Sequence, residues 1–340
     1  MEKTIKKIKR ILPIIGIILF IYILLNTGIS NIVSALSEVN LPLLIIAVIL
    51  LIVIIIGRNA QWQIILRRQK IKIGFLKSLK IQLIGRFYSS TTPGNIGYYL
   101  KIFYLKEQTN EPLGKLFVNS FITGTVTSIS LYIMMVIGAI VLSEQYPPAF
   151  YASLIFLLIN GILCLYFVKK ERGERTIKTL IRYFIPQKLK NHLNSFTDTF
   201  YKDFPKIRYL IIPFIVGGIL NLVSFSQTYI IALSLGINQI AFLPFMAIMT
   251  IVYLVTVIPI TVGGLGTREA TMVSLFSLYG VEPASTVALS LTNFLINNIP
   301  NTYGLMLAIS ETTEKREISR VRKHVNKAIK GLTSVGSKFL

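Results

Sequence analysis

The chain has 340 residues, of which 53% are hydrophobic and only 15% are charged. About a quarter of the residues in a soluble domain are charged, so the composition excludes an ordinary soluble domain. The formal net charge is +22, yet the basic residues fall between apolar runs and not on one soluble surface. We assign this excess to cytoplasmic loops and to attraction by anionic lipid, and we expect no nucleic-acid partner.

Cysteine and histidine are too sparse for a metal centre. The single cysteine, Cys164, lies within an apolar run, which leaves no disulfide framework and no thiolate site. His192 and His324 lie far apart in basic segments. We therefore expect no metal, no cofactor and no catalytic residue.

The first element is an apolar run that follows a basic N-terminus. Residues 1–10 carry five Lys or Arg residues, which places the N-terminus in the cytoplasm. The pattern is similar to a signal peptide, but no convincing cleavage site follows, so we predict a retained helix. The loop at 26–41 has no Lys or Arg and is expected outside. A second span at 42–58 returns to the cytoplasm.

Further uncharged runs predict the remaining spans, because about 20 apolar residues cross the hydrocarbon core. Residues 1–310 are expected to form a single all-α, polytopic membrane domain. We predict about eight membrane helices and two re-entrant or broken segments, which suggest two pseudo-repeated halves. The loop at 169–208 and the tail at 311–340 are basic, amphipathic and expected to be cytoplasmic. The later spans are expected at 116–142, 148–168, 209–235, 240–258 and 284–309.

The first broken segment is "IGRFYSSTTPGNIGYYLKIFYL", Ile84 to Leu105. Both of its flanks are cytoplasmic by their charge, so the segment must enter and leave the membrane on one side, as a re-entrant hairpin does. Non-helical backbone at membrane depth is stable only within protein or beside a wet cavity. The candidate substrate-binding residues of this segment are Arg86, Pro93, Gly94, Asn95, Gly97 and Lys101.

The second broken segment is "PITVGGLGTREA", Pro259 to Ala270. A helix that begins near Thr267 and covers 268–280 reaches only about 20 Å, too short to cross the core. The N-terminus of such a half-helix favours an anion such as phosphate. We expect Arg268 to donate to that anion. Glu269 is expected either to hold Arg268 or a second basic group in place or to recognise a cationic headgroup. The alternative is a cytoplasmic turn in which both side chains meet water. The candidate residues here are Gly263, Gly264, Gly266, Thr267, Arg268 and Glu269.

Pro93–Gly97 and Pro259–Gly263 share the spacing Pro-x-x-x-Gly. Paired breaks in the two halves of a membrane protein indicate a transport site. Arg58 closes the second span in "GRNAQWQ", where it either anchors the helix at the interface or lines the cavity. Asn297 on the last span either lines the cavity or bonds a neighbouring helix. Asn221 is expected to contact another helix.

These motifs resemble the lysylphosphatidylglycerol synthase transmembrane-region, or flippase-like, family. The resemblance rests on "PITVGGLGTREA", "SSTTPGNIG" and "GRNAQWQIILRRQ", and it covers about residues 5–310 in order. After the Pro-Gly element the family commonly has a second glycine, an acid and a nearby arginine, where this chain has Tyr98, Tyr99 and Lys101. The resemblance implies an eight-helix-type fold with re-entrant segments and movement of a polar-headed lipid between leaflets. Bifunctional members carry a cytoplasmic aminoacyl-transfer domain after the membrane part, which we do not expect here.

The sequence supports one function above two others. The first is a lipid flippase or scramblase of a prokaryotic cytoplasmic membrane, not an enzyme, with both termini in the cytoplasm. Its substrate is a lipid with an anionic phosphate headgroup, of the aminoacyl-phospholipid, phospholipid or polyprenyl-phosphate type, and its movement is passive or coupled to an ion gradient. The second is a membrane-embedded lipid transferase, for which catalytic patterns are lacking. The third is a non-transporting partner of a cytoplasmic lipid-modifying enzyme, docked through 169–208. Besides lipid, the expected partners are such an enzyme or further copies of the chain.

Overall fold

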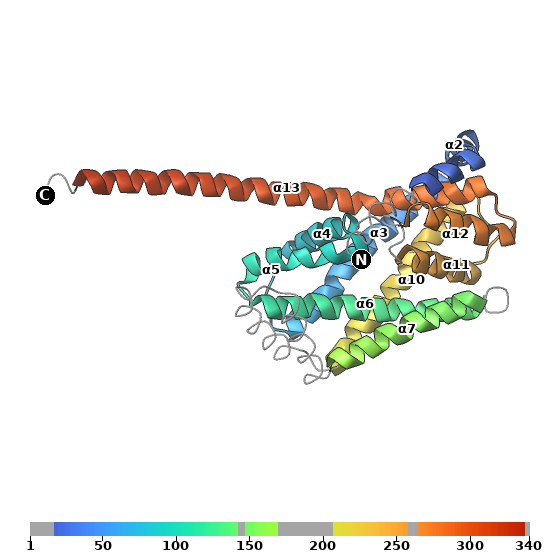
Figure 1. Cartoon of the computed structure of the whole chain (residues 1–340), viewed down its shortest axis with the longest axis horizontal. Coiled ribbons are helices and arrows are strands. Elements are labelled where there is room, and N and C mark those ends of the chain that lie inside the picture. Colours follow the sequence, from blue (N-terminus) through green and yellow to red (C-terminus); the bar gives the residue numbers. More distant parts are fainter. Residues whose placement is uncertain (1–16, 142–146, 169–206, 258–260, 262–263, 337–340) are drawn as a thin grey trace, which may run out of the picture.

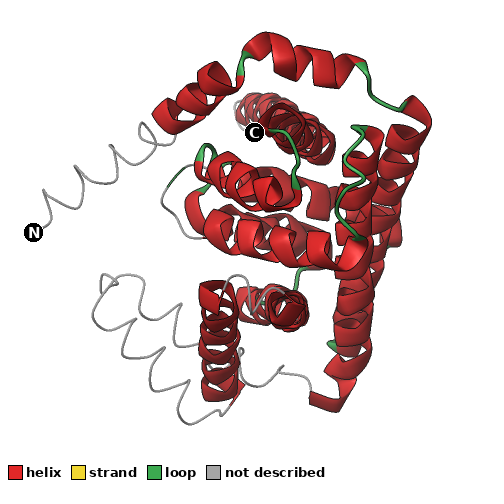
Figure 2. Cartoon of the chain, turned by 90° about the vertical axis from the view of Figure 1, so that its right-hand side faces the viewer, coloured by secondary structure: helices red, strands yellow, loops and turns green. Residues whose placement is uncertain are grey.

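The computed structural model describes residues 17–141, 147–168, 207–257, 261 and 264–336. Every regular element in this part of the chain is a helix, as the sequence predicted (Figure 2). The loop at 169–208 lies almost entirely outside the described residues, so its amphipathic helices stay a prediction.

The N-terminal part is a bent pair of helices. Ile17–Thr27 and α2 (Ile29–Ser37) meet at an angle of 75°. Gly28 joins them with a φ of 84°, in the left-handed region that glycine adopts without strain. The expectation of a loop throughout 26–41 is therefore wrong, because α2 occupies most of it and packs against the C-terminal helix. An uncharged stretch of small polar and apolar residues carries no clear signal for so short a helix.

Helix α3 (Leu41–Arg68) extends well beyond the predicted span at 42–58. The Asn40 side chain accepts the N–H of Leu43 at 3.2 Å and caps the helix N-terminus. Helix α3 packs along α10 (Ile211–Ser234), where a Cβ on Gly57 would lie 2.5 Å from a methyl group of Leu220. The two helices can therefore approach closely at this glycine.

The first broken segment folds back on itself, as predicted. Helix α4 (Phe75–Ser90) is followed by the short 3-10 helix η1 (Pro93–Leu100), which packs against α4. Pro93 has no N–H to continue the hydrogen-bond ladder of α4. Helix α5 (Lys101–Thr109) then leads to α6 (Leu113–Val141). Helix α7 (Pro147–Val168) runs beside α6 along the lower edge of the molecule in Figure 1.

The second half contains α11 (Phe242–Val257), the short α12 (Thr267–Phe276) and α13 (Pro283–Gly336). Helix α12 and the 3-10 turn η4 (Ser277–Tyr279) after it match the predicted short helix closely. Helix α13 is continuous over 54 residues, although the sequence predicted a span that ends at 309 and a separate tail. Pro300 lies inside α13 without ending it. The C-terminal half of α13 projects away from the other helices (Figure 1).

Two of the buried hydrophobic clusters support the broken segments. The larger one joins the N-terminal pair to α10, α11, α12 and α13, and in it Phe245 packs edge-on against Phe276. The smaller one surrounds Trp62 between α3, α4, α5 and α6. Each broken segment is therefore supported by a core of its own.

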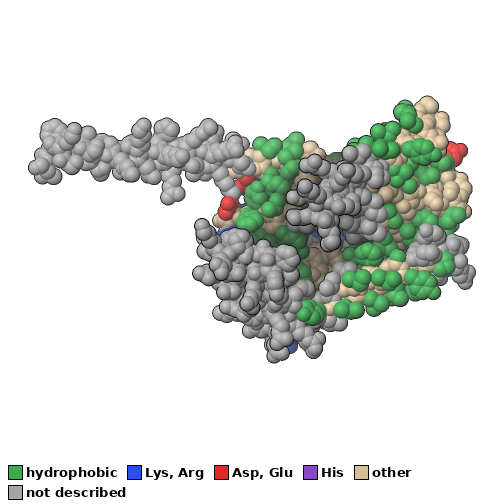
Figure 3. All heavy atoms as spheres, viewed as in Figure 1, with side chains coloured by type: hydrophobic (Ala, Val, Ile, Leu, Met, Phe, Trp, Pro, Cys, Tyr) green, Lys and Arg blue, Asp and Glu red, His purple; other side chains and the backbone are tan. Residues whose placement is uncertain are grey.

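Within the described residues, three helices are long and apolar enough to cross a membrane, namely Leu41–Arg68, Leu113–Ile140 and Arg208–Ser234. The bent N-terminal pair adds a fourth if it counts as one span. Many large hydrophobic side chains of the described helices are exposed, and they form wide patches in Figure 3. Such surfaces are expected where helices face lipid. The predicted total of about eight spans and the two pseudo-repeated halves stay predictions, since most of Pro259–Gly263 lies outside the described residues.

Candidate functional site

The polar stretch of α3 is buried between helices. Trp62 is fully buried and donates its indole N–H to Asn119 Oδ1 on α6 at 2.6 Å. Gln61 Nε2 donates to the carbonyl oxygen of Pro213 on α10 at 2.8 Å. These two side chains therefore join helices inside the protein and do not form an anchor belt at the membrane surface.

Arg58 lies on the same part of α3 and bonds to neutral groups. Its guanidinium donates to Gln61 Oε1 at 3.4 Å and to Asn221 Oδ1 on α10. Asn221 in turn donates to Ser130 Oγ on α6 at 3.0 Å, so it is the contact between helices that the sequence predicted. Arg58 is half-buried where α3, α6 and α10 meet.

Arg86 on α4 bonds to α13, also through neutral groups. Its Nε donates to Asn301 Oδ1 at 3.0 Å, and its Nη2 donates to the carbonyl oxygen of Asn297 at 3.4 Å. Asn297 thus meets Arg86 through its backbone, while its side-chain amide bonds within α13. Gly304 permits the close approach of the two helices, because a Cβ there would lie 2.2 Å from the carbonyl oxygen of Leu83.

Lys101, the first residue of α5, is fully buried. Its Nζ donates to the Tyr98 hydroxyl at 2.5 Å. The same nitrogen lies 3.7 Å from the centroid of the Tyr98 ring and 4.1 Å from that of Trp62. A desolvated cation–π contact contributes about 2 kcal/mol, whereas burial of an ammonium group costs several kcal/mol. The two aromatic faces therefore offset much of that cost but provide no counter-charge.

Arg58, Arg86 and Lys101, called here the interior cations, converge on one region. Arg58 lies within electrostatic reach of Arg86 and of the Tyr98 hydroxyl that Lys101 contacts. Within the described part of the chain, none of the three forms an ion pair; the ion pairs there belong to Lys80, Lys115 and Arg268. Ionisable groups inside a membrane protein are costly and usually functional. The region is therefore suited to bind an anion.

The Pro-Gly turn before Lys101 has a structural role at Gly97. The Gly97 N–H is donated to Thr92 Oγ1 at 2.7 Å, and a Cβ on Gly97 would lie 2.1 Å from the carbonyl oxygen of Tyr88. Only glycine fits this approach between η1 and α4. Pro93, Gly94 and Asn95 form the start of η1, and their side-chain surroundings lie outside what the structure describes.

The second broken segment turns sharply before α12. Gly264 and Gly266 have φ angles of 76° and 81°, so both adopt the left-handed conformation. Gly266 occupies the N-cap position and Thr267 is the first helical residue, so the helix begins one position earlier than predicted, when Thr267 was expected to be the N-cap. The Thr267 hydroxyl donates to the carbonyl oxygen of Gly264 at 3.1 Å and so closes the turn. Gly263 lies outside the described residues.

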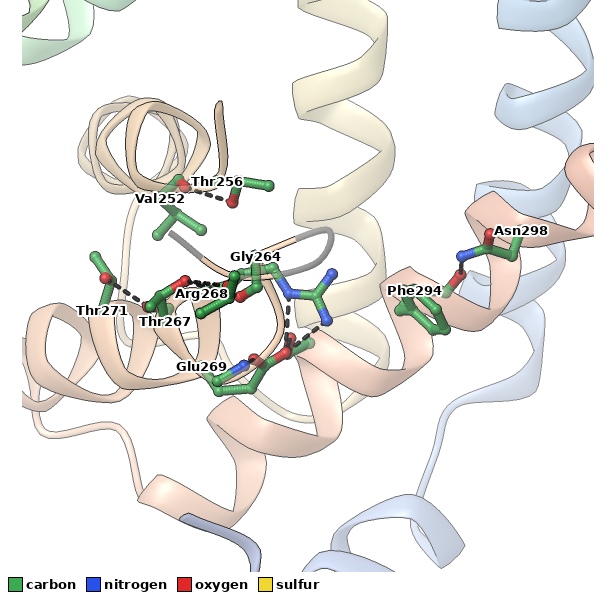
Figure 4. A network of polar contacts seen from close by, with 12 residues as sticks. Val252, Thr256, Gly264, Thr267, Arg268, Glu269, Thr271, Phe294 and Asn298 are labelled. Carbon is green, nitrogen blue, oxygen red and sulfur yellow. Dashed lines mark hydrogen bonds and ion pairs between the residues drawn. The ribbon is translucent and has the colours of Figure 1, made fainter. Parts of the chain in front are cut away.

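Glu269 is the anion of this second segment. It is fully buried and accepts the N–H of Gly266 at 2.7 Å, Arg268 Nε at 2.9 Å and the Ser290 hydroxyl of α13 at 2.6 Å (Figure 4). The predicted role of Glu269 in holding Arg268 is confirmed. The expected phosphate at this helix N-terminus is not favoured, because the Glu269 carboxylate already takes the N-cap donor and balances Arg268. The hydrated turn considered as the alternative is also wrong, since only 14% of the Arg268 side chain is exposed.

A cavity of about 810 Å³ lies on another face of α12. It is bounded by the bent N-terminal pair, by Ala270 and Ser274 of α12, and by the start of α13. Glu38 and Glu282 line it, and none of the described residues around it is Lys or Arg. Its volume falls within the range of small-molecule sites. Its charge is opposite to that of the interior cations.

Sequence reasoning missed four side chains that complete these sites. Trp62 stood within the quoted "GRNAQWQ" motif, and Tyr98 appeared only as a departure from the family pattern. Asn301 and Ser290 gave no signal, because one amide or hydroxyl in a long apolar run is indistinguishable from many others. Within the described ranges, no group of three or more His, Cys, Asp or Glu side chains lies together that could hold a metal ion. The missed residues are Trp62, Tyr98, Ser290 and Asn301.

A comparison with known protein families identifies the family of this chain. The sequence profile of the lysylphosphatidylglycerol synthase TM region matches residues 11–303. The chain belongs to this family. The matched range includes both broken segments and all three interior cations.

Several curated relatives cover nearly the whole chain. A UPF0104 membrane protein of Pyrococcus horikoshii is 23% identical over 324 residues, which is 88% of this chain and 96% of the relative. One from Methanocaldococcus jannaschii is 24% identical over 90% of this chain and 96% of its own length. One from Methanothermobacter thermautotrophicus is 22% identical over 84% and 90%. No solved structure matches the chain. The chain is therefore a membrane protein with archaeal relatives of similar extent.

Proposed function

We propose that this protein moves a lipid with an anionic phosphate headgroup between the leaflets of a prokaryotic cytoplasmic membrane, as a flippase or scramblase and not as an enzyme. One observation carries the proposal. The three interior cations bond to amide, carbonyl, hydroxyl and aromatic groups, and none is paired with a carboxylate in the described part of the chain.

A phosphate supplies the missing counter-charge. Guanidinium groups bind phosphate oxygens through paired, charge-assisted hydrogen bonds. Arg58 comes from α3, Arg86 from α4 and Lys101 from α5, so an anion bound among them is held by three separate helices. The lipid tails remain in the bilayer beside the exposed apolar surfaces of these helices. Lipid binding by the interior cations is consistent with membership of a family named for a lipid synthase.

The cavity beside α12 supports a route between the leaflets. It reaches Ala270, the residue after Glu269, and is bounded by Glu38 and Glu282 elsewhere. The sequence predicts that the neighbouring 26–41 segment faces the outside, whereas the loops flanking Arg86 and Lys101 face the cytoplasm. We place headgroup entry at the interior cations and headgroup release at this cavity.

Flipping by the purified protein tests the proposal. Proteoliposomes with fluorescently tail-labelled phosphatidylglycerol are treated with dithionite, which destroys label in the outer leaflet only. We expect the parent protein to expose the inner-leaflet label and Arg58→Gln/Arg86→Gln to do so at least about tenfold more slowly, because hydrogen bonds to charged groups contribute 1.5–3 kcal/mol each. Lys80→Gln is the matched control, since Lys80 is a cation of the same helix as Arg86 but is already balanced by Glu311 at 2.8 Å. Equal rates in the double variant and the parent would exclude this site.

A further inference from the structure

Lys101 differs from the other two interior cations because its charge is reversible. Arginine stays protonated in proteins, whereas a buried lysine exchanges its proton with changes in its surroundings. We propose that Lys101 binds a proton together with the anionic headgroup, so that the protein transports one proton with each lipid. This inference rests on the proposed function and adds the energy source to it.

The contacts of Lys101 allow both forms of its side chain. The ammonium donates to the Tyr98 hydroxyl at 2.5 Å, and a neutral amine would accept the phenolic proton at the same place. The rings of Tyr98 and Trp62 favour the cation. Complete burial disfavours it. With these opposing effects, one additional charge nearby decides which form is present.

The groups that face Lys101 provide no negative charge of their own. Arg58 on α3 and Arg86 on α4 are permanent cations, and Tyr98 on η1 is an uncharged phenol at neutral pH. The acid nearest in sequence on α5, Glu107, is exposed. On α6, Lys115 is paired with Glu111 at 3.0 Å. On α13, which packs against α4, Glu311 is paired with Lys80 at 2.8 Å. The other titratable groups of the hairpin between Arg86 and Lys106 are the phenols of Tyr88, Tyr99 and Tyr104.

A phosphate bound beside Tyr98 therefore shifts the equilibrium between the charged and neutral forms of Lys101. An anion near a lysine favours the ammonium form, so phosphate binding promotes proton binding. Linkage is reciprocal, so protonation of Lys101 also raises the affinity for phosphate. The proton comes from water on the side where the headgroup enters and returns to water on the side where it leaves. The net charge moved with the anionic lipid is then reduced by one.

A pH gradient across proteoliposomes tests this coupling. The vesicles contain tail-labelled phosphatidylglycerol, and potassium with valinomycin holds the membrane potential at zero. One proton per lipid makes a gradient of about one pH unit shift the equilibrium leaflet ratio about tenfold, toward the alkaline side. Dithionite then reports the fraction in the outer leaflet.

Lys101→Arg is the decisive variant, because it keeps the positive charge and cannot release it. Whatever its flipping rate, we expect its equilibrium leaflet ratio to be the same with and without the gradient. A parent protein that flips lipid but shows no shift overturns the coupling and leaves the proposed function standing. A parent protein that does not flip lipid at all overturns both. A Lys101→Arg variant with the same shift as the parent removes Lys101 from the coupling.

A second measurement does not depend on the folding of any variant. The parent protein in detergent and weak buffer is mixed with short-chain phosphatidylglycerol, and the pH of the solution is recorded. We expect proton uptake that saturates with lipid binding and is absent with a neutral short-chain diacylglycerol. Binding of phosphatidylglycerol without proton uptake overturns the proposal.

Discussion

The two broken segments solve the same problem of buried charge in opposite ways. In the first, Arg86 and Lys101 lie in a hairpin whose polar partners are neutral, and Arg58 joins them from α3. In the second, Arg268 is balanced within the chain by Glu269. Both segments contain a proline followed by glycine and a nearby arginine or lysine. Among the described residues only the first segment retains an unbalanced positive charge, and this is where we propose that the headgroup phosphate binds.

The comparison also separates the uses of glycine in the two segments. Gly97 and Gly304 let backbones of neighbouring elements pack closely around the first segment. Gly264 and Gly266 instead provide the left-handed turn that aims Glu269 back at the start of α12. The first set creates contact between helices, and the second creates a local turn. Neither set is needed to touch a ligand.

Of these variants, Glu269→Gln should lower the stability of the protein most, because it removes the negative charge that balances Arg268 in the second segment. Arg268 keeps its charge while its neighbour becomes neutral. Loss of one partner of a buried pair destabilises a protein by 3–5 kcal/mol; since Arg268 is slightly exposed, we expect about 3 kcal/mol. Thermal unfolding of the purified protein in detergent measures this change.

The double variant Arg268→Gln/Glu269→Gln is the control for that experiment. It removes both charges and leaves neither of them unpaired, so it should lose less stability than Glu269→Gln. If the double variant were the less stable of the two, the pair would not be the source of the effect.

Gly304→Ala should lower the stability of the protein by less, because it forces α13 away from α4 of the first segment. The new Cβ would meet backbone atoms of Leu83 that cannot rotate away. Overpacking of this kind costs about 1–3 kcal/mol, and the bonds from Arg86 to α13 should loosen with it. We expect a lower unfolding temperature together with slower lipid flipping.

Gly161→Ala provides the matched change on α7, where a Cβ would meet nothing within 4 Å. Alanine is the better helix former by about 1 kcal/mol, so this variant should be as stable as the parent or more so. Equal losses in the two variants would contradict the role of the Gly304 contact.

Much of this fold follows from the sequence, because spans are set by long uncharged runs. Helices α6, α7, α10 and α11 begin and end within a few residues of the predicted spans. The positions of glycine, proline and charged residues also predicted the short helix near 268–280 and the point after Arg86 where the chain folds back. These features depend on local composition, which a sequence shows directly.

The balance of charge in each segment could not be predicted, because it depends on where side chains point. The sequence places Arg268 and Glu269 side by side but does not show that the carboxylate turns back to Gly266 and reaches Ser290. It also does not show that Lys101 lies between Trp62 and Tyr98, residues 36 positions apart. Glu at the third helical position after a glycine was the one available signal, since such residues often bond the N-cap N–H.

The smallest change in the rate of lipid flipping is expected from Glu38→Gln/Glu282→Gln. This double variant tests the cavity beside α12, where we propose that the headgroup is released. Both carboxylates are exposed in the cavity beside α12, so stability should not change. They attract an amine headgroup and repel an anionic one, and exposed charges act weakly, by about 0.2–0.5 kcal/mol each. We therefore expect the flipping rate of phosphatidylethanolamine relative to phosphatidylglycerol to fall about two- to fivefold. Glu111→Gln, at an acid paired with Lys115 away from the cavity, should leave the ratio unchanged. An unchanged ratio in the double variant would remove the cavity from the route while leaving the interior cations in place, because the two regions act on different parts of the headgroup.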